Sequence, residues 1–70
     1  MNIYEILSKN LKWFRNSESL TQQQLSEKLN IPRANLARYE TGENVPSLEI
    51  LSRYADFFDT TIDALIERID

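Results

Sequence analysis

Apolar residues recur at helical spacing along the whole sequence, and no stretch alternates apolar and polar residues as a half-buried β-strand does. In the first segment, Ile3, Leu7, Leu11 and Phe14 follow at steps of four, four and three residues. This spacing predicts an amphipathic helix over about residues 3–16 with those side chains facing inward. The chain is therefore expected to be all-α, a compact bundle of five short helices in a single domain over residues 1–70.

A start signal places the second helix. Thr21 and Gln24 have the spacing of a capping box, in which each side chain bonds the backbone of the other residue. A helix is therefore predicted over about residues 21–29, with Leu25 and Leu29 facing inward.

A turn and a stop signal place the third helix. Asn30 is one of the few non-glycine residues that tolerate a left-handed backbone, so we expect it in the turn after the second helix. Pro32 suits the first turn of a new helix, where its missing N–H is not needed, and Gly42 suits a C-terminal cap. The third helix is predicted over about residues 32–41.

Two further helices complete the prediction. Ser47 caps a fourth helix, and Thr60 starts a fifth over about residues 61–69. The predicted inward residues are Leu48, Leu51, Ala55 and Phe58 in the fourth helix and Ile62, Leu65, Ile66 and Ile69 in the fifth.

The chain has no cysteine and no histidine. Disulfides and thiolate metal sites are therefore excluded, and the commonest general base and zinc ligand is missing. Asp56, Asp59 and Asp63 lack the spacing and the glycine of a calcium-binding loop, so we interpret them as a solvated acidic face. We expect no metal site, no cofactor and no enzymatic activity.

The small size of the chain favours a partner. A chain of 70 residues buries only about 60% of the surface of its unfolded form, so a second subunit is the remaining obvious stabiliser. No apolar run approaches the roughly 20 residues of a membrane span, and residues 1–5 do not resemble a signal peptide. We expect a cytoplasmic protein that does not bind membranes.

The net charge of −3 is unevenly distributed. Residues 1–42 hold six lysines and arginines against four glutamates, whereas residues 43–70 hold two arginines against seven aspartates and glutamates. One half is therefore mildly basic and the other strongly acidic. A nucleic acid would be bound by the basic half, through few phosphate contacts and with modest affinity.

The third helix has two different faces at 100° per residue. Leu36 and Tyr39 face the core together. The opposite half carries small and basic residues: Arg33 at its edge, Ala34, Ala37 and Arg38. Arginine can read the O6 and N7 atoms of guanine, and alanine can touch the methyl group of thymine. Two arginines can equally be solvated surface charges, so this helix alone leaves both interpretations open.

From Leu11 to Leu65 the sequence resembles the helix-turn-helix family of lambda-type phage repressors and Cro proteins, also called the XRE family. The matching residues are Leu20-Thr21-Gln22-x-x-Leu25-Ser26-x-x-Leu29-x-Ile31-x-Arg33-x-x-Leu36-x-x-Tyr39-Glu40-x-Gly42, followed by Pro46-Ser47-Leu48. Their order and spacing agree without a gap. The resemblance implies the lambda repressor-like DNA-binding fold.

The resemblance also implies a role for each matched position. The base-contacting positions are Arg33, Ala34, Asn35 and Arg38, and the phosphate-contacting positions are Thr21, Gln22, Thr41 and Asn44. Arg15 and Glu40 match a salt bridge that ties the first helix to the end of the third. Pro32 stands where the family has a serine or threonine cap, so one side-chain hydrogen bond should be missing there.

We therefore expect a transcription regulator, a repressor that binds a pseudo-palindromic double-stranded operator as a homodimer with helix 32–41 in the major groove. Repression would block RNA polymerase, although contact with polymerase can also activate. Apolar residues beyond the needs of the core predict a dimer contact: Phe57, Ile62, Ile66 and Ile69. The acidic half supports an alternative, a protein-interaction module such as an antitoxin that keeps the fold but binds DNA weakly or not at all.

Overall fold

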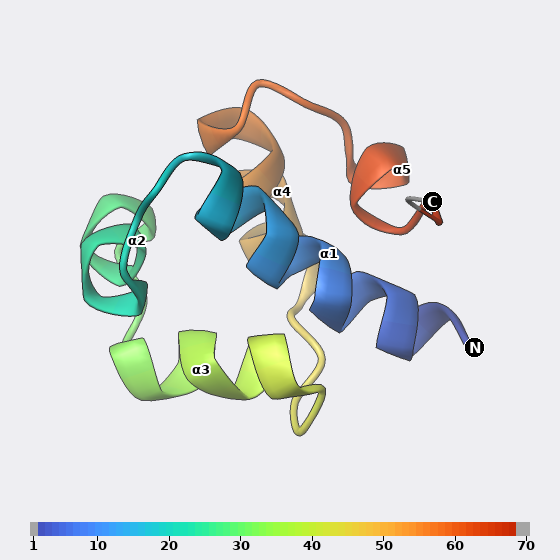
Figure 1. The fold of residues 1–70 in the computed structure, drawn as a ribbon, viewed down its shortest axis with the longest axis horizontal. Coiled ribbons are helices and arrows are strands. Elements are labelled where there is room, and N and C mark those ends of the chain that lie inside the picture. Colours follow the sequence, from blue (N-terminus) through green and yellow to red (C-terminus); the bar gives the residue numbers. More distant parts are fainter. Residues whose placement is uncertain (1, 69–70) are drawn as a thin grey trace.

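Five helices form in residues 2–68, the part of the chain that the computed structural model describes (Figure 1). They are α1 (Ile3–Ser17), α2 (Gln22–Leu29), α3 (Arg33–Thr41), α4 (Leu48–Phe57) and α5 (Ile62–Leu65). Helix α1 crosses the middle of the molecule and packs against α3 and α5, while α2 packs against α3 and α4. The predicted all-α fold is confirmed. Within the same residues, no helix combines the length and hydropathy needed to cross a bilayer.

The core consists of the inward face of each helix. Its buried apolar residues are Leu7, Leu11, Leu25, Leu29, Ile31, Leu36, Leu51, Tyr54, Ala55 and Leu65. Each fully buried leucine contributes about 1.5–3 kcal/mol relative to an exposed one, so this cluster supplies most of the stability. The helical spacing correctly predicted the buried side of α2 and the middle of α1.

Two residues predicted to face inward are instead exposed. Ile3 exposes 49% and Leu48 exposes 74% of its surface. Both lie in the first turn of their helix, where side chains lean toward the N-terminus and project past the neighbouring helices. In α4 the inward face is formed by Leu51, Tyr54 and Ala55, so the prediction missed the tyrosine.

The capping box that was predicted before α2 is present. The N–H of Gln24 donates to Oγ1 of Thr21 at 3.0 Å, and the N–H of Thr21 donates to Oε1 of Gln24 at 2.9 Å. Ser47 likewise caps α4, because its Oγ accepts the N–H of Ile50 at 3.2 Å. Short-range hydrogen bonds therefore decide where these helices begin.

Helix α5 is shorter than predicted. It spans Ile62–Leu65 instead of reaching residue 69, and its N-cap is one residue later than expected, at Thr61. The buried side-chain amide of Asn10 in α1 donates to the carbonyl oxygens of Leu65, at 2.9 Å, and Glu67, at 2.5 Å. The first bond satisfies the carbonyl of the last residue of α5, and the second holds the segment that follows against α1, so the helix ends there.

Tyr54 lies in the centre of the core with no exposed surface. Its hydroxyl has no hydrogen-bond partner among the described residues, and burial raises the pKa of this group above its ordinary value. The hydroxyl therefore stays protonated. Burying such a group without a partner costs about 1–3 kcal/mol.

We expect Tyr54→Phe to raise the free energy of unfolding by about 1 kcal/mol, because it removes the unpaired hydroxyl and keeps the packed ring. Urea denaturation followed by circular dichroism measures this change. Tyr39→Phe, at a half-buried tyrosine, is the control. A loss of stability in Tyr54→Phe would show that the hydroxyl makes a hydrogen bond in solution.

Candidate nucleic-acid interface

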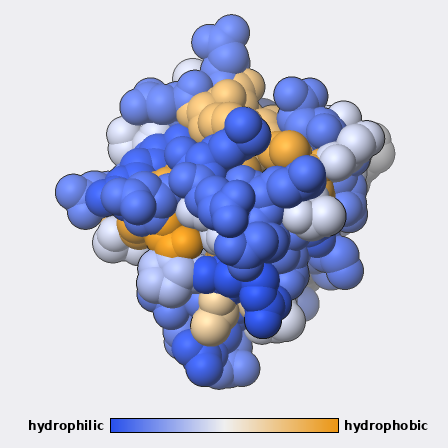
Figure 2. Space-filling model, turned by 90° about the vertical axis from the view of Figure 1, so that its left-hand side faces the viewer, coloured by the Kyte–Doolittle hydropathy of each residue, from blue (hydrophilic) through white to orange (hydrophobic). Residues whose placement is uncertain are grey.

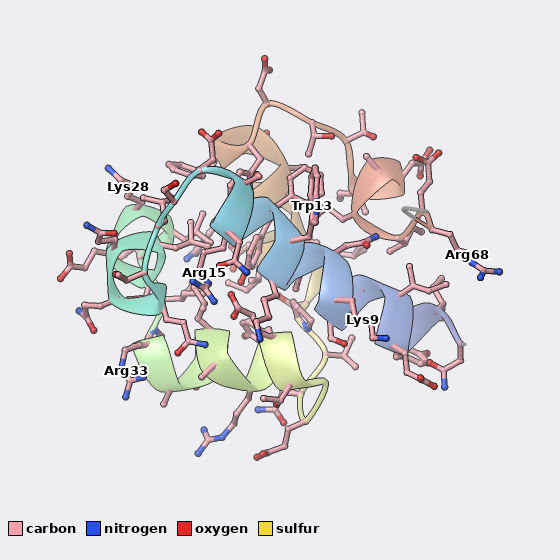
Figure 3. The ribbon with its side chains drawn as sticks, viewed as in Figure 1. Lys9, Trp13, Arg15, Lys28, Arg33 and Arg68 are labelled. Carbon is pink, nitrogen blue, oxygen red and sulfur yellow. The ribbon has the colours of Figure 1, made fainter. Side chains whose placement is uncertain are left out.

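Helix α3 lies along one edge of the molecule, with one side against the core and the other free (Figure 1). Leu36 is fully buried, whereas Arg33, Ala34 and Arg38 are exposed and Asn35 is half-buried. Figure 3 shows the side chain of Arg33 extending outward from the start of α3. The residues predicted to contact bases therefore come together on one accessible helix.

A tight turn joins α2 to α3. Asn30 adopts the predicted left-handed conformation, with φ 56° and ψ 50°. The N–H of Ile31 then donates to the carbonyl of Ser26 at 3.0 Å, and the side chain of Ile31 enters the core. Pro32 is the N-cap of α3 rather than its first residue, and no side chain caps that helix start. The expected missing hydrogen bond is thus a feature of this turn.

The far end of α3 is tied to α1 by a buried carboxylate. Nε and Nη2 of Arg15 donate to the two oxygens of Glu40 at 2.7 Å and 2.9 Å, and Nη1 donates to the carbonyl of Leu20 at 2.8 Å. The Glu40 side chain exposes 2% of its surface and that of Arg15 exposes 11%. The hydrogen bond to Glu40 raises the pKa of Arg15 above its ordinary value. The pair that the family resemblance implied is therefore a nearly dry, bidentate contact.

Gln22 joins the same contact. Its Nε2 donates to Oε1 of Glu40 at 3.2 Å, which places the start of α2 beside the last turns of α3. One side-chain N–H of Gln22 thus points inward, toward Glu40. Thr21, the residue before it, uses its backbone and hydroxyl in the capping box.

The other two residues predicted to contact phosphate follow α3. Gly42 ends the helix in the left-handed conformation, with φ 84°. Thr41 donates its hydroxyl to the carbonyl of Arg38 at 3.2 Å and accepts the N–H of Glu43 at 3.3 Å. The N–H of Asn44 also donates to the carbonyl of Arg38, at 3.2 Å, and its side chain is exposed. The loop is therefore folded back over the end of the helix.

The sequence analysis missed a neighbour of Arg38. Oε2 of Glu43 lies 3.2 Å from Nε of Arg38, and both side chains are largely exposed. A left-handed glycine cap reverses the chain, so an acidic residue directly after Gly42 was the signal for this pair. Arg33, by contrast, has no ion-pair partner within residues 2–68.

The side of the molecule that carries α2 is mainly hydrophilic (Figure 2). Apolar residues appear there in separate patches rather than as one band. A broad apolar surface usually marks a protein interface. This side is better suited to a polar partner.

The predicted dimer contact lies away from α3, at the end of α4 and in α5 (Figure 1). Phe57 exposes 37% of its surface, whereas Ile62 and Ile66 are half-buried and pack against the core. Ile69 lies outside the described residues. The free apolar surface at this end is therefore smaller than the sequence predicted.

We expect Glu40→Gln to lower the free energy of unfolding by about 3–5 kcal/mol, because it leaves the Arg15 guanidinium buried without its counter-charge. Urea denaturation measures the loss. Glu43→Gln removes an exposed pair and should change stability by less than about 1 kcal/mol. Similar small changes in both variants would contradict the structural importance of the buried pair.

Comparison with known proteins places the chain in a family. A helix-turn-helix family model matches residues 11–65. The chain is 38% identical over 56 residues to the transcriptional activator BcrR of Enterococcus faecalis, covering 80% of this chain and 28% of that protein. It is 41% identical over 54 residues to the transcriptional regulator AnsR of Bacillus subtilis, covering 77% of this chain and 47% of that protein. The chain thus spans less than half of either relative.

A solved structure supports the fold. The restriction-modification controller protein C.AhdI from Aeromonas hydrophila superposes with a TM-score of 0.80 at 22% identity, over 86% of this chain and 91% of that chain. Because the family model covers most of the sequence and includes all of α2 and α3, this chain belongs to the XRE-type helix-turn-helix family of transcription regulators.

Proposed function

We propose that the chain is a sequence-specific double-stranded DNA-binding domain of a transcription regulator that places α3 in the major groove. The observation that carries this proposal is the exposed face of α3, where Arg33, Ala34 and Arg38 lie on a helix anchored at its far end by Glu40. A major groove admits one α-helix, and small side chains let that helix approach closely.

Each exposed residue of α3 suits a particular base edge. Arg33 and Arg38 present guanidinium groups, which form paired hydrogen bonds with O6 and N7 of guanine. Ala34 is suited to the methyl group of thymine, and Asn35, on the flank, to an adenine edge or a phosphate. Arg33 has no ion pair to break, whereas Arg38 must leave Glu43 first.

Phosphate contacts would come from backbone groups as well as side chains. The first N–H groups of α2, at Gln22 and Gln23, have no partner inside the helix and lie at its positive end, where anions bind. Gln22 would therefore contact phosphate mainly through its backbone N–H, since its side chain donates to Glu40. Thr21 flanks this position, and Thr41 and Asn44 offer polar groups from the loop after α3.

We further propose a symmetric homodimer joined through Phe57, Ile62, Ile66 and Ile69. The partial exposure of Phe57 and of the half-buried Ile62 and Ile66 supports this contact. Two such subunits would place their α3 helices in successive major grooves, about 34–36 Å apart, on a pseudo-palindromic site. The surrounding acidic residues repel one another across the interface, so the dimer should be weak at low salt.

Repression follows from this geometry if the occupied site overlaps the site of RNA polymerase. The relative BcrR is named an activator. Transcription in vitro from a template that carries the bound site, with and without the protein, therefore distinguishes repression from activation.

The alternative is a protein-interaction module, such as an antitoxin, with little affinity for DNA. The pairing of Arg38 with Glu43 and the acidic second half favour it. A specific DNA complex loses affinity steeply and linearly as log salt rises. If selection from a random pool yields no duplex whose affinity falls in this way with salt, the result would support the alternative.

We expect Arg33→Ala to weaken binding to a duplex selected from a random pool by about 1–3 kcal/mol and to relax sequence preference at one position. Fluorescence anisotropy titrations measure the affinity. Glu43→Gln is a control with the opposite expected effect. It frees Arg38 and removes a negative charge, so it should strengthen binding to every duplex. Unchanged binding after both Arg33→Ala and Arg38→Ala would contradict base reading by α3.

We expect the homodimer to become tighter as the ionic strength rises from about 0.01 M to about 0.1 M, where the Debye length falls from about 30 Å to about 10 Å. The reason is that salt screens the repulsion between two acidic halves, whereas it weakens DNA binding. Sedimentation equilibrium measures the association, and Phe57→Ser should abolish it. A monomer at all salt concentrations would rule out this interface.

A further inference from the structure

Arg53 connects α4 to the turn between α2 and α3. Its Nη1 donates to the carbonyl oxygens of Leu29 and Asn30, each at 3.2 Å. Its Nη2 lies 3.6 Å from a carboxylate oxygen of Glu49, one turn earlier in α4. The side chain is partly exposed, and its Nη1 faces the backbone of the turn.

These two carbonyls stand at a position that needs a donor. The last carbonyls of a helix have no partner inside it and lie at its negative end, where a cation is favourable. Leu29 ends α2, and Asn30 is the left-handed residue at which the chain changes direction toward α3. A guanidinium held there by a third helix fixes both the end of α2 and the direction of the chain that leaves it.

The start of α3 has few other polar restraints. Pro32 provides no side-chain cap, whereas the far end of α3 is held by Arg15 through Glu40. The two hydrogen bonds of Arg53 are therefore a polar side-chain restraint on the turn next to Arg33, in addition to the buried side chain of Ile31. Arg53 lines a hollow with Phe57, and Arg33 lines another with Pro32; Asn30 lines both, so the turn lies between the two arginines.

We propose that Arg53 is a positioning residue: it holds the turn so that the face of α3 bearing Arg33 keeps one orientation, without itself contacting DNA. This inference rests on the proposed function. Base reading needs hydrogen-bond geometry, whereas attraction to phosphates tolerates a reoriented helix. Loss of Arg53 should therefore lower discrimination more than general affinity.

The test compares Arg53→Met with Arg68→Met. Both remove one positive charge, and Figure 3 shows Arg68 on the opposite side of the molecule from Arg33. Affinities are titrated on a duplex selected by the wild-type protein and on a random duplex of equal length. Arg53→Met should weaken binding to the selected duplex roughly tenfold, which is about the loss expected when one base contact is misaligned. Its affinity for the random duplex should stay nearly unchanged. Arg68→Met should leave the ratio of the two affinities, selected to random duplex, unchanged.

Further readouts separate positioning from other roles. The slope of log affinity against log salt should stay unchanged in Arg53→Met, because a lost phosphate contact would reduce it by about 1. Arg53→Lys should recover part of the discrimination, since an ammonium can donate to the same carbonyls, and Glu49→Gln should have no effect. The proposal would be overturned if folded Arg53→Met lost affinity equally for both duplexes, or if it kept the wild-type affinity for both.

Amide hydrogen exchange tests the restraint without DNA. The N–H of Ile31, in the turn, should exchange faster in Arg53→Met than in Arg68→Met. Unchanged exchange there would overturn the role of Arg53, whatever the protein binds. If the wild-type protein selects no duplex at all, the proposed function fails instead.

Discussion

The position of α3 depends on one buried ion pair. A carboxylate as dry as that of Glu40 is stable only when it is both paired and hydrogen-bonded, and the Arg15 guanidinium supplies both. The same guanidinium donates to Leu20 in the loop before α2. One side chain therefore joins α1, that loop and α3. A shift of α1 against α3 would leave buried charge uncompensated, and a shift of the loop would remove one hydrogen bond of the guanidinium.

Stability and orientation come from different contacts in this domain. The leucines of the core supply most of the free energy of folding, but apolar burial has no preferred direction. Helix α3 buries one apolar side chain fully, Leu36, and packs Tyr39 partly against the core, so apolar burial fixes its orientation only loosely. The hydrogen bonds of Arg15 to Glu40 in α3 and, as we propose, those of Arg53 to the turn before α3 supply the direction.

Features that depend on neighbouring residues were predictable from the sequence. The capping box at Thr21 and the left-handed conformations of Asn30 and Gly42 involve residues within a few positions of one another. The end of α5 was not predictable, because it depends on Asn10, which lies 55 residues before Leu65. The contact of Arg53 with the turn spans 24 residues and has no local signal either. For Arg15 and Glu40, the pairing followed from the family resemblance rather than from their spacing.

The uneven distribution of charge should affect the orientation in which the protein approaches a polyanion. Helix α5 lies on the far side of the molecule from α3 (Figure 1), and Asp56, Asp59 and Asp63 belong to α4, the loop after it and α5, so the molecule carries an electric dipole moment as well as its net charge of −3. In the field of a duplex, that dipole experiences a torque that turns the acidic end outward. If the domain binds DNA as we propose, the repulsion of its acidic part would help to orient it, so that α3 meets the duplex first.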